Sequence, residues 1–198
     1  MDLGLTGKVA IVTGGSDGIG KAAAISMASE GAKVAIVGRT QEKLDAAVSE
    51  IKNASGGDAI GVAADVSVES DVKAMVDKVV GEFGQLDILV NNAGTSSATT
   101  LEKMTDEDLK VDFGIKVYGA VYCARAALPH LKKSGAGAIV NTTTPGGKAP
   151  NPGGQPTSLS RAAGISLTKS WAGELAKDNI RVNTVCVGVL KSGQHRAR

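Results

Sequence analysis

VAIVTGGSDGIG, residues 9–20, is the stretch that decides the fold we expect for this chain. A short apolar run of strand length ends in closely spaced glycines, and residues 21–30 follow with a pattern typical of a helix. Glycines at such a turn let the backbone approach a pyrophosphate, whose charge is attracted by the amide groups and dipole of the next helix. A glycine pattern alone also occurs in ordinary turns, so its surroundings must decide. Here Gly31 ends the helix and residues 33–37 form a second strand run, which together predict a βαβ unit.

The rest of the chain continues the same alternation of strand-like and helix-like segments. The further expected helices are residues 41–51, 68–83, 112–131 and 157–176, and the further expected strands are residues 59–63, 86–90, 138–142 and 180–187. Parallel strands need crossover helices, and helices on both faces explain why the apolar runs are continuous rather than alternating. We therefore expect an α/β fold, a Rossmann-like doubly wound parallel sheet between two helical layers, as a single domain over residues 1–198.

The composition narrows the classes of function. The chain has 198 residues, 42% of them hydrophobic and 21% charged, which is ordinary for one globular domain. The net charge is +2 and no basic run with interleaved aromatic residues occurs, so we expect no nucleic-acid partner. We find no secretory leader and no apolar run approaching the roughly 18 residues of a membrane helix, so we expect a cytoplasmic protein without membrane contact. Cys123 and Cys186 lack metal-ligand spacing, and we interpret both as small buried hydrophobic residues, with no metal site.

One segment interrupts the alternation. Residues 145–156 (PGGKAPNPGGQP) contain four prolines and four glycines, so they can form neither a helix nor a central strand. We expect a loop at the carboxyl end of the sheet, the edge at which ligands bind in open α/β sheets. The loop is therefore expected to form a lid or mouth of the site, and the alternative is a plain connection.

Four motifs, in order along the chain, resemble those of the short-chain dehydrogenase/reductase family. They are TGGSDGIG at residues 13–20, Asp65-Val66 after the third strand, NNAG at residues 91–94 after the fourth, and IRVN at residues 180–183 in the last. The resemblance implies a nicotinamide-dependent oxidoreductase that acts on a small-molecule alcohol or carbonyl compound. It also implies the residues around the coenzyme: Gly14, Ser16, Asp17, Gly18 and Ile19 at the phosphates, Asp65 at the adenine amino group, Val66 beside the base, Asn92, Ala93 and Gly94 beneath the ribose, and Val189 after the last strand.

The choice of coenzyme depends on the end of the second strand. An acidic residue there would accept hydrogen bonds from a ribose 2′-hydroxyl and repel a 2′-phosphate. Arg39 and Thr40 stand at this place, and a guanidinium can bind a phosphate through two bonds while a hydroxyl donates another. Asp17 in the glycine loop argues mildly for the opposite choice. We expect NADP(H) to be preferred over NAD(H).

The four positions that correspond to the family's catalytic Asn, Ser, Tyr and Lys all carry other residues. They are Lys116, Thr144, Thr157 and Arg161, in that order. Loss of the tyrosine is the serious change, because its pKa starts near 10 whereas that of a threonine hydroxyl lies nearer that of water, about 15.7. Removing a general acid typically lowers a rate by about 10²- to 10⁴-fold. Arg161 keeps a positive charge that could hold ribose hydroxyls, yet it cannot pass protons as lysine does.

No other residue is an obvious replacement for the missing acid. Tyr118 and Tyr122 lie roughly 200° and 240° around the helix from Lys116, so they face away from a site that Lys116 faces. His195 has a suitable pKa near 6.5 but stands in the terminal run. Lys116 beside Arg161 would place two cations near the nicotinamide, which favours NADPH over NADP⁺. The alternative is that Lys116 is a solvated helix residue.

Two functions stay open at this point. One is an atypical NADP(H)-dependent reductase in which Thr144, Thr157 and Lys116 polarise the carbonyl group, and the other is a noncatalytic NADP(H)-binding sensor or partner subunit. The helical patterns at residues 112–131 and 157–176 resemble the family's subunit contacts, which implies a homodimer or homotetramer, although they could simply cover the sheet. The family usually continues past the last strand through a substrate loop, so we expect the substrate region to be short or missing.

Overall fold

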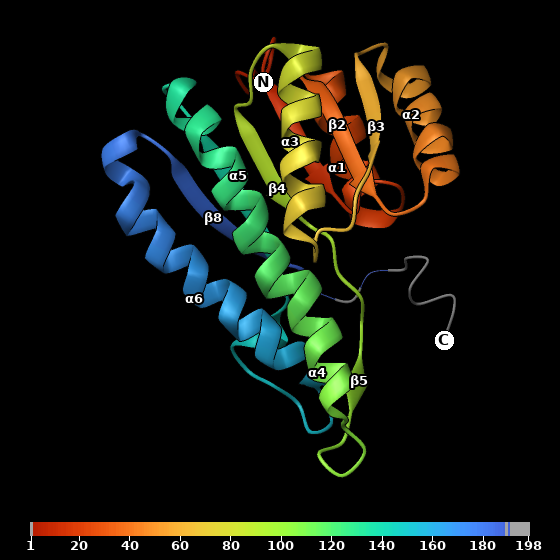
Figure 1. Cartoon of the computed structure of the whole chain (residues 1–198), viewed down its shortest axis with the longest axis vertical. Helices are drawn as coiled ribbons and strands as arrows, with labels where there is room; N and C mark the ends of the chain where they lie inside the picture. The colour runs from red at the N-terminus through yellow and green to blue at the C-terminus, as the bar shows by residue number, and fades with distance from the viewer. Residues whose placement is uncertain (1, 189, 191–198) are drawn as a thin grey trace.

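A six-stranded parallel sheet forms the centre of the computed structural model, which describes residues 2–188 and 190 (Figure 1). The strands lie in the order β3-β2-β1-β4-β6-β8. Their bounds are β1 Val9–Thr13, β2 Lys33–Gly38, β3 Ala59–Ala63, β4 Ile88–Asn91, β6 Ala138–Thr143 and β8 Arg181–Cys186. The direction of the strand order reverses between β1 and β4, and in open α/β sheets ligands bind beyond the carboxyl ends of the strands at such a point. The expected doubly wound parallel sheet is confirmed.

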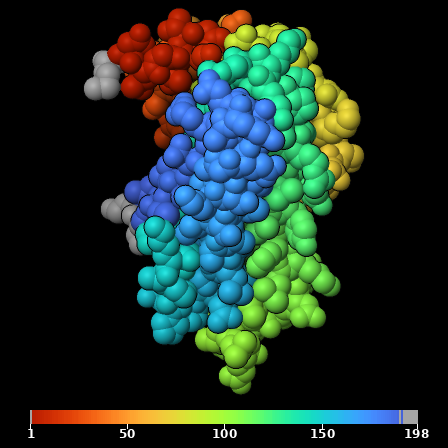
Figure 2. All heavy atoms as spheres, turned by 90° about the vertical axis from the view of Figure 1, so that its left-hand side faces the viewer, coloured from red at the N-terminus to blue at the C-terminus, as the bar shows by residue number. Residues whose placement is uncertain are grey.

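Helices cover both faces of the sheet. One layer contains α1 (Gly18–Ser29) and α2 (Gln41–Ser55), and the other contains α3 (Glu69–Phe83), α5 (Gly119–Lys133) and α6 (Thr157–Leu175). Figure 2 shows α6 across the side of the molecule, with α5 beside it. Alternate residues of a strand point to opposite faces, so β1 sends Ile11 to the core under α3 and α5 and Val12 to the core under α1 and α2. Burial on both faces is why the strands read as continuous apolar runs.

The long helix expected over residues 112–131 begins earlier and contains a wider turn. α4 spans Asp106–Phe113 and begins at a capping box, in which the Thr105 hydroxyl accepts from the Asp108 amide and the Asp108 carboxylate accepts from the Thr105 amide. A π-helical segment, η1 (Gly114–Tyr118), then joins α4 to α5. The start of α4 carries no apolar period because residues 105–111 are mostly exposed, and this is why the sequence pattern did not indicate it.

The proline- and glycine-rich segment at residues 145–156 contains no α-helix and no strand of the main sheet, as expected. It begins with a 3₁₀ turn, η2 (Pro145–Gly147), and ends in the short strand β7 (Gln155–Pro156). β7 pairs antiparallel with β5 (Ala98–Thr99) in a separate two-stranded sheet. The proline- and glycine-rich segment packs below the main sheet, in the lobe that also contains α4 (Figure 1). Farther along the chain, a 3₁₀ turn, η3 (Ala176–Asp178), follows α6.

The two cysteines differ in their surroundings. Cys123 on α5 is buried, as expected, whereas Cys186 is exposed, so our interpretation of it as a buried residue was wrong. Cys186 is the last residue of β8, and β8 is an edge strand with a neighbour on one side only.

Within residues 2–188 and 190, no helix is both long and apolar enough to cross a membrane. The same part of the chain holds no group of three or more His, Cys, Asp or Glu side chains arranged for a metal ion.

Candidate active site

The turn after β1 and the loop after β4 are joined by hydrogen bonds between the side chains of Thr13 and Asn92 and backbone groups of the opposite segment. The Thr13 hydroxyl accepts from the amides of Asn92 (2.9 Å) and Ala93 (3.0 Å), and the Asn92 side chain donates to the carbonyls of Thr13 (3.0 Å) and Gly14 (3.2 Å). A Cβ atom on Gly20 would lie 2.2 Å from the Gly14 carbonyl oxygen, and one on Gly14 would lie 2.9 Å from the Ala93 Cα. Gly14 also has a φ of +65°, which side chains rarely adopt. The glycines are therefore required by close packing of two loops as well as by access for a ligand.

The first part of the cleft lies at the carboxyl ends of β1, β2 and β3. It has a volume of about 220 Å³. The predicted coenzyme residues that line it are Gly14, Ser16, Arg39, Thr40, Asp65, Val66, Ala93 and Gly94. Lys43, in the first turn of α2, lines it too and was missed; its place one helical turn after Thr40 was the available signal. The Ser67 hydroxyl lowers the pKa of Asp65, and the Ser67 amide and the charge of Arg39 act in the same direction. This part thus has two cations beside an ionised carboxylate.

The second part of the cleft adjoins the first, because Gly14, Ser16, Gly94 and Thr95 line both parts. It has a volume of about 370 Å³. The other predicted site residues that line it are Asp17, Gly18, Ile19, Asn92, Thr144, Thr157 and Arg161. Val189 and His195 lie outside the described residues. None of residues 145–156 lines either part of the cleft; the η2 turn packs against the first turns of α6 instead, with Gly147 close to Arg161 and Ala162.

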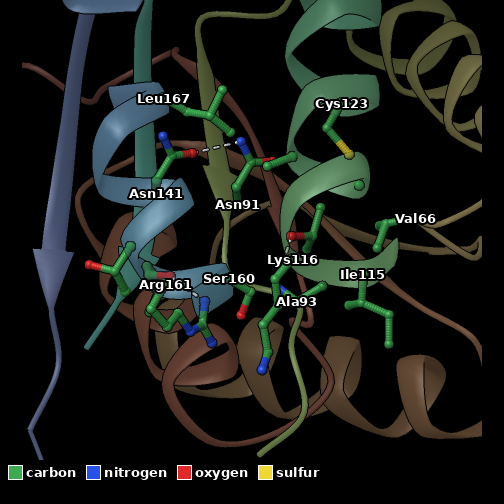
Figure 3. Close-up of a pocket in the computed structure, with 16 residues that line it drawn as sticks. Val66, Asn91, Ala93, Ile115, Lys116, Cys123, Asn141, Ser160, Arg161 and Leu167 are labelled. Atoms are coloured by element: carbon green, nitrogen blue, oxygen red, sulfur yellow. Dashed lines mark hydrogen bonds between the residues drawn. The ribbon is translucent and has the colours of Figure 1, made fainter. Parts of the chain in front are cut away.

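Lys116 is buried beneath the second part of the cleft. Its ammonium group forms a salt bridge with Asp112, four residues earlier, and both side chains are 0% exposed. The ammonium also lies 3.0 Å from the Thr157 hydroxyl oxygen. Figure 3 shows Lys116 from η1 and Arg161 from α6 reaching into the same space. Lys116 is therefore not a solvated helix residue.

Asp112 is a site residue that sequence reasoning missed. Its carboxylate accepts hydrogen bonds from Lys116 and from Ser160, and its Oδ2 atom lies 3.2 Å from the Thr157 hydroxyl. The two cations expected near the nicotinamide lie in the same region, and Asp112 balances the charge of one of them. The i, i+4 spacing of Asp112 and Lys116 was the signal, but it equally fits an exposed pair on a helix surface.

Burial changes the titration of the two cations. It lowers the pKa of Lys116 from 10.5 to about 8; the charge of Arg161 acts in the same direction and the Asp112 carboxylate opposes it. Burial also lowers the pKa of Arg161, again opposed by Asp112. One Arg161 nitrogen donates to the Thr142 carbonyl at 2.6 Å, whereas its Nε is buried without a partner in the described structure. A buried donor without an acceptor is a feature that a bound ligand can satisfy.

Thr157 is held firmly at the tyrosine position. Its hydroxyl donates to the Ser97 carbonyl (2.7 Å) and accepts from the Ser97 amide (3.1 Å), in addition to its contact with Lys116. Tyr118 is 56% exposed, and Tyr122 stacks on it with 6.3 Å between ring centroids. Neither tyrosine lines the cleft, so neither replaces the missing phenol.

The reversed strand order, the glycine turn at a helix N-terminus and the two-part cleft beside it define a dinucleotide-binding protein of the Rossmann type. A family model described as short chain dehydrogenase matches residues 8–198. The chain therefore belongs to the short-chain dehydrogenase/reductase family, whose fold is that of oxidoreductases that use a nicotinamide coenzyme.

Relatives and solved structures agree with this assignment. The chain is 39% identical over 186 residues to a 3-oxoacyl-(acyl-carrier-protein) reductase of Staphylococcus aureus, covering 93% of this chain and 75% of the relative. It superposes with a TM-score of 0.94 and 37% identity on the L-sorbose reductase of Gluconobacter frateurii complexed with NADPH and L-sorbose, covering 98% and 73% of the two chains. The 3-ketoacyl-(acyl-carrier-protein) reductase of Brucella melitensis complexed with NADH gives a TM-score of 0.91 at 34% identity, covering 96% and 78%.

The residues present fit a nicotinamide dinucleotide. The cleft has two adjoining parts, as a dinucleotide requires, and backbone amides of a helix N-terminus lie where the parts meet. The Nε of Arg161 has no partner in the described structure, and Arg161 lines the second part of the cleft, so this donor would be free for a polar group of the coenzyme. When bound, the coenzyme supplies or accepts the hydride.

Proposed function

We propose that this chain is an NADP(H)-dependent oxidoreductase that interconverts an alcohol and a carbonyl compound with a substituted set of catalytic residues. The observation that carries the proposal is one continuous cleft with Arg39 and Lys43 at one end and Thr144, Thr157 and Arg161 at the other.

The preference for NADP(H) rests on the first part of the cleft. Arg39 and Lys43 both line it, so a 2′-phosphate would meet two cations there. Asp17, which argued for NAD(H), lines only the second part of the cleft and stands at the N-terminus of α1. Its charge is therefore removed from the place where the two coenzymes differ.

At the other end of the cleft, the chain offers hydroxyl groups and a cation to the reacting oxygen. Thr144 and Thr157 would donate hydrogen bonds to the carbonyl oxygen, and Arg161 would hold the ribose. These groups position the substrate and stabilise developing negative charge, contributions that do not need a strong acid. We expect turnover to be slow, because a threonine hydroxyl is a weak acid.

A second candidate function is supported by the contacts of Thr157. Because its hydroxyl already bonds to both backbone polar groups of Ser97, the tyrosine position serves to fasten the loop after β4 to α6. A chain that binds NADP(H) tightly and reduces nothing would act as a sensor or as a partner subunit.

One experiment separates the two functions. Oxidation of NADPH would be followed spectrophotometrically with a panel of carbonyl compounds that includes 3-oxoacyl thioesters and ketoses, the compound classes named for the relatives. An oxidoreductase turns over at least one of them, whereas a sensor binds NADPH in calorimetry and turns over none. The double variant Thr157→Tyr/Arg161→Lys should raise the rate by about 10²-fold or more if the scaffold is built for this reaction. The matched control, Ser49→Tyr/Lys52→Arg on the exposed side of α2, should leave the rate unchanged.

A further inference from the structure

The site contains a buried ion pair, Asp112 and Lys116, to which the proposed function gives no role. We call this pair and the side chains around it the Asp112 cluster: Asp112 from α4, Lys116 from η1, and Thr157, Ser160 and Arg161 from α6. It holds one carboxylate and two cations, so it carries one excess positive charge. Asp112 and the Lys116 side chain are fully buried, and an uncompensated charge in such surroundings is costly.

The hydroxyl oxygen of Thr157 connects Lys116 with the cleft. The second part of the cleft is lined by Thr157 and Arg161 but not by Lys116, and Lys116 lies 3.0 Å from the Thr157 hydroxyl oxygen. Thr157 is therefore both within hydrogen-bonding distance of a buried ammonium group and in contact with the space where the carbonyl group would lie. At this position the weakly acidic hydroxyl of Thr157 can relay a proton from the more acidic ammonium group of Lys116.

We infer that Lys116 is the proton source for carbonyl reduction and that the Thr157 hydroxyl carries the proton to the carbonyl oxygen. The inference rests on the proposed function and adds the acid that the four substituted positions lack. Asp112 is a positioning residue, because its carboxylate holds the Lys116 ammonium and the Ser160 hydroxyl on the same side of Thr157.

With the reduced coenzyme bound, a hydride with its electron pair would form the new C–H bond at the carbonyl carbon while the C=O π bond breaks toward oxygen. The two electrons would come from the coenzyme. The oxygen takes the proton of the Thr157 hydroxyl, and Thr157 takes one proton from Lys116, which becomes a neutral amine. The Thr157 hydroxyl is within donating distance of the Ser97 carbonyl (2.7 Å) and of the Asp112 carboxylate (3.2 Å), so rotation about its Cβ–Oγ1 bond must turn the hydrogen toward the substrate before transfer. Because the Lys116 side chain is fully buried, water in the cleft then restores its proton through the Thr157 hydroxyl.

Charge within the cluster favours this transfer. Once Lys116 is neutral, Asp112 and Arg161 remain as one anion and one cation, so the excess charge has left the buried region. The same excess charge and the burial bring the pKa of Lys116 to about 8, close to the pH at which a general acid works best. Besides Lys116 and Arg161, the titratable residue among the described residues that line the pocket around Lys116 is Cys123 of α5. Burial raises the pKa of that thiol to about 12, so it stays neutral and adds no charge.

The first test does not depend on turnover. In protein labelled with ¹³C-lysine, the Lys116 signal would be assigned by its loss in Lys116→Met and followed from pH 6 to 11. We expect a midpoint near pH 8, and a higher midpoint in Arg161→Gln because a repelling charge is gone. Lys110→Met, which removes an exposed lysine of α4, should delete a different signal and leave the Lys116 midpoint unchanged. A Lys116 midpoint above pH 10 would contradict the inference.

The second test is the pH dependence of kcat/KM for reduction. The wild type should lose activity tenfold per pH unit above about pH 8, because reduction needs the protonated amine. Lys116→Met, and independently Thr157→Val, should lower kcat/KM by about 10²- to 10⁴-fold and remove this break, with NADPH affinity within threefold of wild type in calorimetry. Thr157→Ser keeps a hydroxyl and should keep the break, and Lys110→Met should behave as wild type.

The outcomes distinguish this inference from the proposed function. Tight NADPH binding without turnover of any carbonyl compound defeats both. Turnover that persists with an unchanged pH break in Lys116→Met, or at an undiminished rate in Thr157→Val, defeats only the proton pathway. Lys116→Met and Thr157→Val remove the proton pathway at opposite ends. If one variant fails to fold, the other still tests the inference.

Discussion

Arg39 is the residue whose proposed part in the choice of coenzyme can be isolated most cleanly. It lines the first part of the cleft at the end of β2, together with Lys43. A hydrogen bond to a charged group contributes about 1.5–3 kcal/mol, so Arg39→Gln should weaken NADPH binding by about tenfold to a hundredfold. NADH binding should change little. Isothermal calorimetry with both coenzymes measures this, and Lys52→Gln on the exposed side of α2 is the control. Equal losses for the two coenzymes would contradict a 2′-phosphate contact.

Gly20 is a residue whose replacement should affect stability directly. A Cβ atom there would lie 2.2 Å from the Gly14 carbonyl oxygen and 2.6 Å from the Asn92 side chain, and the carbonyl belongs to a tightly fixed turn. Gly20→Ala should therefore lower the free energy of unfolding by about 1–3 kcal/mol or more. Gly81, in the interior of α3, has open space around it, so Gly81→Ala should instead stabilise by roughly 0.5–1 kcal/mol. Chemical denaturation of the two variants checks the contrast.

Sequence motifs locate residues of the cleft where they mark the ends of parallel strands. The glycine turn, Arg39 and Asp65 all line the cleft because each lies within two residues of the end of such a strand, and these ends meet at one edge of the sheet. Asp112 could not be found in this way. Its importance comes from the burial of a helix face against α6, and no local pattern distinguishes that face from an exposed one.

At the scale of elements, the buried salt bridge joins η1 to α4 and, through Asp112, to α6. Its effect on folding can be measured through pH. The pKa of Lys116 is about 8 in the folded chain and 10.5 in the unfolded one, so between these values the unfolded chain binds more protons and rising pH stabilises the fold. The gain from pH 8 to 10.5 should be about 3 kcal/mol.

The difference in the free energy of unfolding between the wild type and Lys116→Met isolates the gain that is due to Lys116. Cys123 acts in the opposite direction above about pH 9, because burial raises its pKa to about 12, but both proteins contain it. Urea denaturation of the two proteins across this pH range should show the wild type gaining on the variant as pH rises. A constant difference between them would mean that Lys116 has an ordinary pKa in the folded chain.

The six strands of the main sheet could be predicted from sequence to within two residues, because buried parallel strands leave continuous apolar runs. The two-residue strands β5 and β7, the start of α4 and the π-helical segment η1 could not. α4 begins among exposed polar residues, and a π turn has no composition of its own that would distinguish it from the α-helix around it.

For the molecule as a whole, the exposed side of α6 is the surface at which we expect copies to associate. The exposed residues of this helix include the small residues Ala162, Ser166, Ser170 and Gly173, together with Leu159, Lys169 and Glu174. Figure 2 shows this helix at the surface with α5 next to it. Small exposed residues let another helix approach closely, and the homodimer or homotetramer stays a prediction on this ground.

Sedimentation velocity tests the association. The wild type at micromolar concentration should sediment as a dimer or tetramer, and Ser166→Arg should shift it toward a monomer with an unchanged circular dichroism spectrum. Ala46→Arg, on the exposed side of α2, places the same charge far from this surface and should have no effect. A monomeric wild type would show that α6 merely covers the sheet.

The side chains of Thr13 and Asn92 hold the glycine turn against the loop after β4, and neither residue is among the four substituted catalytic positions. The shape of the coenzyme cleft and the chemistry at Thr157 therefore depend on different side chains. A chain with this architecture can exchange its proton donor while the loops that form the cleft stay in place.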